Sequence, residues 1–281
     1  MSEKVISIMG CGWLGTPLAE KLLLESWAVK GSTTHEGKLS QLAEKGVDPY
    51  LITLTPEGVE GNVVAFLDTD VLIVNVPPGR SSPIEANTYP SKIRRLVGKL
   101  TTNNFKGGIF ISSTSVYGNL NGKVTENTPP SPETASGKAL LEVENELLES
   151  AFPWSVLRLG GLIGPARHPG RFFRQKREIA KGDAPVNLIS LEDVIGLLIA
   201  MIHSDLWGNT YHLASTHHPT KRAFYTEAVK AYGWVPPTFL PGGAKAKEID
   251  STHTLQSLSY DLEHENLFKY LTHLTEKAGK V

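Results

Sequence analysis

Lys4-Val5-Ile6-Ser7-Ile8-Met9-Gly10-Cys11-Gly12-Trp13-Leu14-Gly15 is an apolar run that ends in three glycines with the spacing G-x-G-x-x-G. Leucines at helical spacing follow, so the pattern indicates a strand, a tight turn and a helix. In such a turn the first glycine allows a sharp bend, the second lets a pyrophosphate approach the backbone, and the third brings helix and strand together. The sequence therefore predicts a dinucleotide-binding loop, with contacts from Gly10, Gly12, Trp13, Leu14 and Gly15.

Composition narrows the class of protein. The 281 residues include 40% hydrophobic and 20% charged side chains, with a formal net charge of −1. This balance disfavours binding to nucleic acid or to an anionic membrane, and no apolar run reaches the length of a membrane span. Cys11 is the only cysteine, which excludes an internal disulfide and suits a reducing compartment. Together with the absence of a membrane span, the single cysteine leads us to expect a cytoplasmic protein. No histidines and cysteines have metal-ligand spacing, so we expect no metal site.

The end of the next predicted strand bears on the choice of cofactor. Trp27 to Gly31 is predicted to form that strand, and Ser32, Thr33 and Thr34 follow it. NAD-binding folds usually place an acidic residue there to bind the ribose hydroxyls. Small hydroxyls without a carboxylate leave room for a 2′-phosphate, so the sequence favours NADP(H) over NAD(H). The alternative is that these residues only begin the next helix.

Two further strands are predicted to end at the same edge of a parallel sheet. Val71 to Val74 is apolar throughout, as strands buried on both faces are, and it runs into Asn75, Val76 and Pro77. Gly108 to Gly118 is a strand whose end is rich in hydroxyl groups. Because ligands bind at the carboxyl edge of such sheets, we expect the three residues after Val74 to contact the cofactor.

Strand and helix patterns alternate regularly up to residue 165 and less regularly beyond it. We predict an α/β fold: a Rossmann-type, doubly wound parallel sheet over residues 1–165, with a small C-terminal substrate lobe over residues 166–281. The segment 186–203 is predicted to return to the first domain. A helix is expected from about Thr134 to Ser150. Four of its acidic residues are expected to face largely outward: Glu142, Glu144, Glu146 and Glu149.

The segment Ile111 to Gly118 (I-S-S-T-S-V-Y-G) resembles the fifth-strand signature of extended short-chain dehydrogenases/reductases, which include NAD-dependent epimerases and dehydratases. The glycine loop and the segments after the fourth and sixth strands occur in the order that this family has them. Three segments are most similar to the atypical, YeeZ-like branch: Gly10 to Gly15 (G-x-G-W-L-G), Ser112 to Gly118 (S-S-T-S-V-Y-G) and Arg167 to Phe173 (R-H-P-G-R-F-F). The resemblance implies a Rossmann fold and a nicotinamide cofactor.

Two positions depart from the pattern of the extended family. The family usually spaces its glycines G-x-x-G-x-x-G, whereas Met9 stands where the earliest glycine would be; both spacings serve a pyrophosphate. The family's catalytic pair is Y-x-x-x-K, whereas Thr134 stands in the tyrosine position and Lys138 in the lysine position. A threonine hydroxyl is too weak an acid to replace an activated phenol. The usual mechanism therefore does not transfer.

The resemblance implies candidate catalytic roles for three side chains. Ser113 lies where the family has the serine or threonine that binds the substrate hydroxyl, and Lys138 lies where the family's lysine holds the nicotinamide ribose. Tyr117 is a candidate proton donor, although the tyrosine at this position is chiefly structural in the family. The alternatives are a hydrogen bond to the loop backbone for Ser113 and a solvent-facing position for Lys138.

Candidate substrate contacts follow the fifth and sixth predicted strands. They are Thr114, His168 and Arg171. An imidazole can exchange protons near pH 7, and a guanidinium can bind a phosphate or a carboxylate. The alternative for His168 and Arg171 is an interlobe hydrogen-bond cluster. His168 and water are further candidates for the proton donor.

Two functions of different classes stay open. The first is an NAD(P)-dependent oxidoreductase or epimerase-like enzyme that acts by hydride transfer on a small polar carbonyl or sugar-derived substrate. The second is a non-catalytic NAD(P)-binding sensor or scaffold that resembles the NmrA-type regulators. The β-hydroxyacid dehydrogenase and imine reductase group is suggested by Gly12 to Ala19 alone and lacks the hydroxyl-rich strand end, so we reject it. The expected partner is a small-molecule substrate, and a homodimer is left open.

Overall fold

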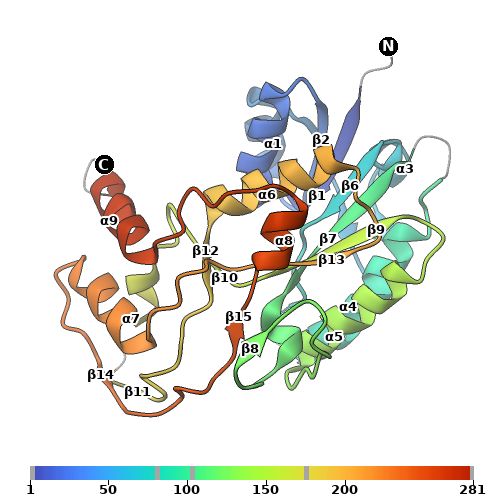
Figure 1. The fold of residues 1–281 in the computed structure, drawn as a ribbon. Coiled ribbons are helices and arrows are strands. Elements are labelled where there is room, and N and C mark those ends of the chain that lie inside the picture. The colour runs from blue at the N-terminus through green and yellow to red at the C-terminus, as the bar shows by residue number, and fades with distance from the viewer. Residues whose placement is uncertain (1–3, 80–82, 102–104, 174–176, 279–281) are drawn as a thin grey trace. The chain divides into compact units, whose positions relative to one another are not determined.

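The computed structural model describes residues 4–79, 83–101, 105–173 and 177–278 (Figure 1). The chain divides into two compact units. The first unit comprises Met1–Gly118, Pro132–Arg158 and Met201–Tyr211. The second comprises Asn119–Ser131, Leu159–Ala200 and His212–Val281. Each unit is therefore assembled from three separate segments of the sequence.

A seven-stranded sheet runs through the first unit in the order β13-β9-β7-β6-β1-β2-β3 (Figure 1). The pairs β1–β2, β1–β6, β2–β3 and β6–β7 are parallel. Every residue of β6 is buried, because an inner strand covered on both faces is shielded from water on each side. The predicted Rossmann-type sheet is confirmed. The strands are β1 Val5–Met9, β2 Ala28–Thr33, β3 Asp48–Leu51, β6 Val71–Val74, β7 Gly107–Ser113, β9 Trp154–Leu159 and β13 Thr210–Leu213.

The register of three inner strands brings predicted site segments to one edge. Met9 of β1 pairs with Val74 of β6, and Val74 pairs with Phe110 of β7. Because these strands are parallel, the glycine loop after β1, the segment that starts at Asn75 and the hydroxyl-rich end of β7 all emerge at the carboxyl edge. This is the edge at which ligands bind in open α/β sheets.

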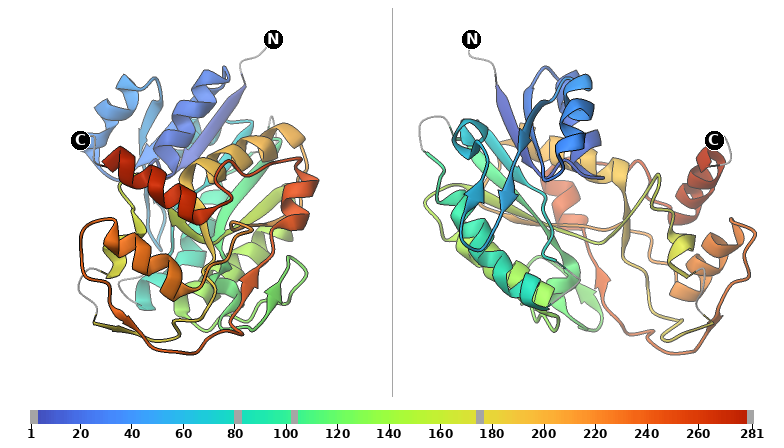
Figure 2. Two further views of the ribbon diagram at one scale, coloured as in Figure 1. Left: turned by 60° about the vertical axis from the view of Figure 1, so that its left-hand side comes forward. Right: turned by 180° about the vertical axis from the view of Figure 1, so that it is seen from behind.

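Helices cover both faces of this sheet (Figure 2). α4 and α5 pack against each other on one face, and α1 lies on the other. Leu18 and Leu22 of α1 are fully buried, as their helical spacing predicts. The remaining elements of the first unit are helices and short segments: α1 Gly15–Leu24, η1 Glu36–Lys38, α2 Leu39–Glu44, β4 Thr53–Leu54, β5 Val59–Glu60, α3 Val63–Leu67, α4 Pro83–Val97, η2 Thr114–Tyr117 and α5 Ala135–Leu148.

The second unit combines short parallel strand pairs with helices. The pairs are β10–β12, β11–β14 and β15–β8. Helix α6, Leu191–Ser204, begins in this unit and ends in the first. The other elements are β8 Lys123–Val124, β10 Gly161–Ile163, η3 Pro169–Phe173, β11 Glu178–Ile179, β12 Leu188–Ser190, α7 Lys221–Lys230, β14 Thr238–Phe239, β15 Glu248–Ile249, α8 Thr252–Ser257 and α9 Leu267–Ala278.

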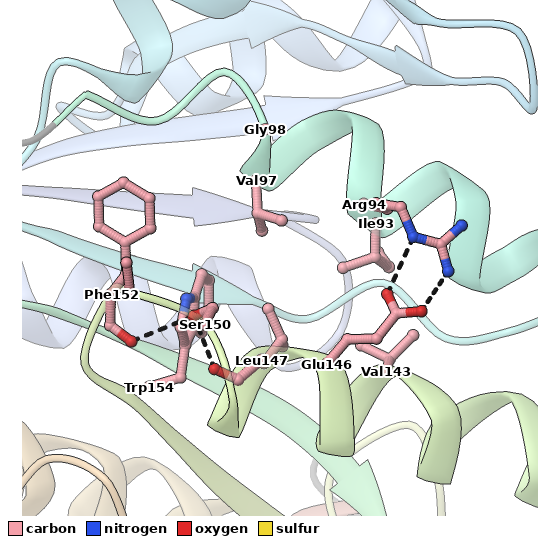
Figure 3. A pocket seen from close by; sticks show the side chains of 11 residues that line it. Ile93, Arg94, Val97, Gly98, Val143, Glu146, Leu147, Ser150, Phe152 and Trp154 are labelled. Atoms are coloured by element: carbon pink, nitrogen blue, oxygen red, sulfur yellow. Dashed lines mark hydrogen bonds and ion pairs between the residues drawn. The ribbon is translucent and has the colours of Figure 1, made fainter.

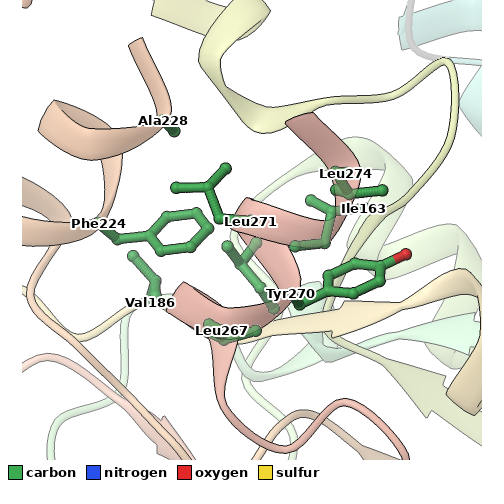
Figure 4. Close-up of a cluster of buried hydrophobic side chains, with 9 residues drawn as sticks. Ile163, Val186, Phe224, Ala228, Leu267, Tyr270, Leu271 and Leu274 are labelled. Atoms are coloured by element: carbon green, nitrogen blue, oxygen red, sulfur yellow. The ribbon is translucent and has the colours of Figure 1, made fainter. Parts of the chain in front are cut away.

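The apolar core of the second unit forms around α9 (Figure 4). Leu267, Tyr270, Leu271 and Leu274 recur at helical spacing and are all at most 5% exposed. One face of α9 is therefore apolar, and it packs against side chains of α7 and β12 such as Phe224. This packing fixes the C-terminal helix within its own unit.

The observed units differ in their boundaries from the predicted domains. Residues 119–131 and 159–165 lie in the second unit, and residues 201–211 lie in the first. Of the segment predicted to return to the first domain, residues 186–200 lie in the second unit. The reason is long-range strand pairing: β8 pairs with β15, and β10 pairs with β12. Local sequence patterns do not contain such pairings.

Candidate functional site

The three glycines of the loop after β1 occupy three different environments. Gly10 has a φ of +103°, a conformation that favours glycine. A Cβ on Gly15 would lie 2.3 Å from the Gly10 carbonyl oxygen, so only glycine lets α1 approach this closely. A Cβ on Gly12 would meet no atom within 4 Å. The fold does not need glycine at position 12, and open space at this backbone is what a pyrophosphate requires.

The N-terminus of α1 follows this loop directly. Its N-cap residue is Leu14, which provides no side-chain cap, and the first turn contains no acidic residue. A helix N-terminus carries partial positive charge and points N–H groups outward. Phosphate oxygens can satisfy N–H groups that no side chain caps. Leu14 is buried and Trp13 is half-buried at this turn.

Ser32, at the end of β2, holds the glycine loop in place. Its hydroxyl oxygen accepts a hydrogen bond from the Gly10 N–H at 2.9 Å and donates to the Met9 sulfur at 3.1 Å. Its carbonyl accepts from the Cys11 N–H at 2.8 Å. The side chain is 2% exposed. Ser32 therefore positions the loop, a role that its sequence position alone did not reveal.

The other predicted contacts on this segment differ in exposure. Thr33 is buried, and its hydroxyl oxygen accepts from the His35 N–H at 3.1 Å. Thr34 is exposed. Of the three hydroxyl residues predicted to line the adenine ribose, Thr34 is thus the one whose side chain reaches the surface.

The segment after β6 forms a further wall beside the glycine loop. The Asn75 side-chain amide donates to the Gly10 carbonyl at 3.2 Å, and the Pro77 side chain is exposed. Tyr89 of α4 donates its hydroxyl to the Val76 carbonyl at 2.6 Å, and burial raises the pKa of this phenol. Sequence reasoning missed Tyr89, because helical spacing indicates a buried position but not the partner of its hydroxyl.

The end of β7 carries Ser113 and Thr114. Ser113 is the N-cap of η2, and its hydroxyl oxygen accepts from the Ser115 N–H at 3.1 Å. The backbone alternative is therefore observed, yet accepting this bond leaves the hydroxyl proton able to donate. Ser113 is half-buried, whereas Thr114 is 7% exposed.

Thr134 and Lys138 lie one turn apart at the start of α5. Thr134 is the N-cap, and its hydroxyl oxygen accepts from the Gly137 N–H at 3.0 Å. A Cβ on Gly137 would lie 3.1 Å from the Ser115 carbonyl oxygen, so α5 approaches η2 closely at this glycine. Lys138 is exposed beside this contact. Thr134, which is predicted to stand in the family's tyrosine position, thus caps a helix.

Four polar side chains from β7, η2, α5 and β9 form a buried cluster. Arg158 donates to the Glu144 carboxylate from Nη2 at 2.6 Å and from Nε at 3.0 Å. Its Nη1 donates to the Tyr117 hydroxyl at 2.5 Å, and its guanidinium lies 5.0 Å from the centre of that ring. Ser112 donates to the Glu144 carboxylate. We call this set the Glu144 cluster; its members are Ser112, Tyr117, Glu144 and Arg158.

Two of the predictions made from the sequence concern members of this cluster. The expectation that Glu144 faces outward is wrong, because its side chain is fully buried. A buried carboxylate needs a partner, and Arg158 supplies one. Burial disfavours the charge on Arg158, but the hydrogen bonds and charge of Glu144 outweigh it and raise the pKa of Arg158. Tyr117 is also fully buried with its hydroxyl bound to Arg158, which argues against its role as proton donor.

His168 belongs to the second unit and is 4% exposed. Its Nδ1 accepts from the Gly170 N–H at 3.2 Å, and its Nε2 lies 3.4 Å from the Thr275 hydroxyl. The ring packs edge-on against Tyr232, with centroids 4.5 Å apart. Burial, followed by the charge of Arg171, lowers the pKa of His168 from 6.5 to about 4. The imidazole is therefore neutral near pH 7, and both ring nitrogens have partners.

Arg171 is exposed in the same unit. Its guanidinium lies 5.8 Å from the centre of the Tyr232 ring, within cation–π range. Tyr232 in turn stacks on Trp234, with centroids 4.6 Å apart. The substrate role of Arg171 stays a prediction.

Cys11 lies within the glycine loop, and its thiol is buried. Burial raises the pKa of the Cys11 thiol to about 12, so it is not an activated nucleophile. Within the described ranges, no group of three or more His, Cys, Asp or Glu residues is placed to hold a metal ion. Among the helices of the part that the structure describes, none is long and apolar enough to cross a membrane.

A cavity of about 290 Å³ lies between the C-terminal parts of α4 and α5 (Figure 3). Apolar side chains such as Ile93 and Val143 line it, and an ion pair between Arg94 and Glu146 links the two helices. None of the predicted site residues lines this cavity. It is therefore separate from the glycine loop and the hydroxyl-rich edge.

No protein-family model matches the sequence. Protein YeeZ of Escherichia coli (strain K12) is 37% identical over 267 residues, which cover 93% of this chain and 96% of YeeZ. The chain belongs to the YeeZ family. The resemblance inferred from the glycine loop and the hydroxyl-rich strand end is thereby confirmed.

Solved structures share the fold of this YeeZ-family chain. UDP-glucose 4-epimerase from Thermotoga maritima, in a crystal structure with UDP-glucose, has a TM-score of 0.79 at 17% identity over 99% of each chain. A short-chain dehydrogenase/reductase superfamily protein from Agrobacterium tumefaciens, with bound NAD, has a TM-score of 0.80 at 14% identity, over 98% of this chain and 97% of that one. The fold is that of the extended short-chain dehydrogenases/reductases.

Proposed function

We propose that this YeeZ-family protein is an NADP(H)-dependent oxidoreductase or epimerase-like enzyme that acts on a small polar carbonyl or sugar-derived substrate. The observation that carries the proposal is the open backbone position at Gly12, next to the uncapped N-terminus of α1. The end of β7 lies at the same sheet edge, so a dinucleotide bound there would extend toward Ser113. Related folds with NAD and with UDP-glucose support this class of ligand.

Each part of the dinucleotide would meet different residues. Backbone N–H groups at the start of α1 would bind the pyrophosphate. Thr34 would face the adenine ribose with a hydroxyl in place of the usual carboxylate, which would leave room for a 2′-phosphate. Lys138 would hold the nicotinamide ribose, and Ser113 would donate a hydrogen bond to the reacting carbonyl oxygen. A bound nicotinamide supplies the hydride donor or acceptor.

The proton that accompanies hydride transfer needs a source other than the family's phenol. Thr134 is engaged as the N-cap of α5, and the Tyr117 hydroxyl is buried against Arg158. His168 is enclosed within the second unit, with both nitrogens engaged. The proposed source is therefore bulk solvent: a bound water would relay a proton from solvent to the alkoxide oxygen that hydride transfer forms and that Ser113 binds.

NADPH consumption across a panel of carbonyl compounds and nucleotide sugars tests this proposal. We expect turnover with at least one compound. Ser113→Ala should lower kcat/KM by about tenfold or more, because it removes a donor aimed at the developing charge. Ser115→Ala is the matched control, since it leaves the backbone N–H that bonds to Ser113. Equal losses in the two variants would contradict the role of Ser113.

A second candidate is a non-catalytic NAD(P)-binding sensor or scaffold. The observation that favours it is the capping role of Thr134, which gives the family's catalytic position a structural use. This candidate predicts tight NADPH binding in titration calorimetry, no turnover of any compound in the panel, and different affinities for NADP⁺ and NADPH. Turnover of any compound would reject it.

The cofactor preference can be tested at the end of β2. We expect NADPH to bind more tightly than NADH, because Ser32, Thr33 and Thr34 offer no carboxylate. Thr34→Asp should reverse the order by placing negative charge where the 2′-phosphate lies. Thr34→Asn is the uncharged control. Tighter NADH binding by the unmodified protein would contradict the preference for NADP(H).

The remaining expectations concern partners and location. A small-molecule substrate is supported by the UDP-glucose in the Thermotoga maritima epimerase crystal. A homodimer and a cytoplasmic location stay predictions, and sedimentation velocity and cell fractionation would test them.

A further inference from the structure

We infer that the Glu144 cluster positions Lys138 relative to Ser113 and thereby sets the affinity for the nicotinamide half of the dinucleotide. This inference rests on the proposed function, which gives Lys138 and Ser113 their roles. Glu144 lies on the same helix as Lys138, and the cluster joins that helix to the strand that ends in Ser113. Arg158, Glu144 and Tyr117 are thus positioning residues.

The Arg158 guanidinium gives the cluster a defined geometry. Its planar fork donates to both carboxylate oxygens of Glu144 on α5, through Nε and Nη2, and Nη1 donates to Tyr117 of η2. Such a two-pronged contact fixes orientation as well as distance. Glu144 and Tyr117 are 0% exposed and Arg158 is 6% exposed, so water cannot substitute for any partner. One placement of α5 against β9 and η2 satisfies all these bonds together.

Two contacts hold α5 on either side of Lys138. Gly137, one residue before it, lies against the Ser115 carbonyl. Glu144, six residues after it, bonds to Ser112 and Arg158. Six helical residues span about 9 Å. A shift or rotation of α5 at Glu144 would therefore move the Lys138 side chain relative to the end of β7.

Stability alone is a weak explanation for this cluster. A buried ion pair contributes little net stability, because the cost of removing two charges from water offsets their attraction. Apolar side chains of similar volume would fill the same space. The hydrogen bonds of the Glu144 cluster instead hold β7 and α5 in a single arrangement. These are the elements that carry Ser113 and Lys138.

Two ligands separate a positioning role from a merely structural one. NADPH spans the whole proposed site, whereas adenosine 2′,5′-bisphosphate lacks the nicotinamide half and would contact only the region near the glycine loop. We expect Glu144→Gln to weaken NADPH binding about tenfold, the scale of a lost charged hydrogen bond. The Kd of the bisphosphate should change less than about twofold. Lys138→Met should show the same pattern, and combining the two changes should add little.

Leu147→Ala is the matched control. Leu147 lies one turn beyond Glu144 on α5 and is 2% exposed, so its truncation weakens the packing of the same helix without touching the cluster. We expect it to lower stability and leave the ratio of the two Kd values unchanged. A selective NADPH loss in Leu147→Ala, or equal losses for both ligands in Glu144→Gln, would overturn the inference.

Tyr117→Phe provides a milder test if Glu144→Gln does not fold. It removes one hydrogen bond to Arg158 and keeps the ion pair. We expect a smaller but still selective loss of NADPH affinity, and no change in either Kd would overturn the inference. Failure of the unmodified protein to bind either nucleotide would instead contradict the proposed function.

Discussion

At the residue scale, glycine has two uses in the loop after β1: Gly15 permits close packing of α1, and Gly12 leaves space for a ligand. Adding one methyl group at each position distinguishes these uses. Gly15→Ala would place a Cβ 2.3 Å from the Gly10 carbonyl oxygen, so we expect a loss of about 1–3 kcal/mol in the free energy of unfolding. Gly12→Ala would place its Cβ in open space. We expect its stability to match that of the unmodified protein, while NADPH affinity falls about tenfold.

Urea unfolding and NADPH titration of both variants check this contrast. Gly12→Ala is the informative member of the pair, because the fold itself tolerates a methyl group there. Normal NADPH binding by Gly12→Ala would contradict the proposal that this loop binds the pyrophosphate.

Thr134 gives a second prediction at this scale. Its hydroxyl caps α5 by accepting from the Gly137 N–H, so Thr134→Ala should lower the free energy of unfolding by about 1 kcal/mol. Thr134→Ser keeps the capping oxygen and should be close to neutral. Thr134→Tyr recreates the family's Y-x-x-x-K spacing but lacks the cap, so it should be destabilised like the alanine variant. Urea unfolding measures all three; an alanine variant as stable as the serine variant would contradict the capping role.

The sequence predicted the glycine loop after β1, but not the direction of the polar atoms around it. The spacing of the glycines placed the loop, because each glycine answers a local steric demand. Ser32 and Ser113 were predicted as ligand contacts, yet both hydroxyls accept bonds from nearby backbone. Glu144 was predicted to face outward, because its partner Arg158 lies on a different element, 14 residues away. Such pairings appear only in three dimensions.

At the element scale, His168 joins η3 to α9 and makes the second unit sensitive to pH. Its pKa is about 4 in the folded protein and 6.5 ordinarily. Between these values the unfolded chain binds a proton that the folded protein does not. The free energy of unfolding should therefore decrease as the pH falls from 6.5 toward 4, by at most about 1.4 kcal/mol per pH unit.

Urea unfolding between pH 4 and pH 7.5 measures this dependence. His168→Gln keeps a polar side chain without a titrating group, so it should show a flatter profile over this range. Parallel profiles for the two proteins would show that another group is responsible. The charge of Arg171 contributes to the low pKa of His168, and Tyr232 packs edge-on against the ring.

Elements with strong periodicity were predicted well, and elements formed by distant pairing were not. The apolar run of β6 and the leucine spacing of α1 predict these elements, because buried positions recur at the period of a strand or a helix. The two-residue strands β8 and β15 have no periodicity, and residue 123 meets residue 248 only through the tertiary fold. The same lack of a local signal explains the different unit boundaries.

At the scale of the whole molecule, we expect the reactivity of the only cysteine to measure whether the glycine loop opens and whether NADPH binds to it. Cys11 is 5% exposed, and burial raises the pKa of its thiol to about 12. We expect slow reaction with a thiol reagent in native buffer. NADPH at one hundred times its Kd should slow the reaction by about a further hundredfold, because only the unbound protein opens the loop.

Gly12→Ala provides the control for this measurement. It should react at the unmodified rate without nucleotide, and the same NADPH concentration should protect it much less. Rapid labelling of the native protein would show that the loop opens without unfolding. Labelling that NADPH does not slow would place the nucleotide away from β1.

The order of the strands has a consequence for biosynthesis. β9 lies between β7 and β13, and β13 comes from residues 210–213, long after β9 leaves the ribosome. We expect β9 to be an unpaired sheet edge of the nascent chain until then. Val156 and Leu157 of β9 are fully buried in the folded protein. Exposed apolar edges pair readily with other chains. Chains released before residue 210 should therefore depend on chaperones, whereas the finished protein closes this edge with its own late strand.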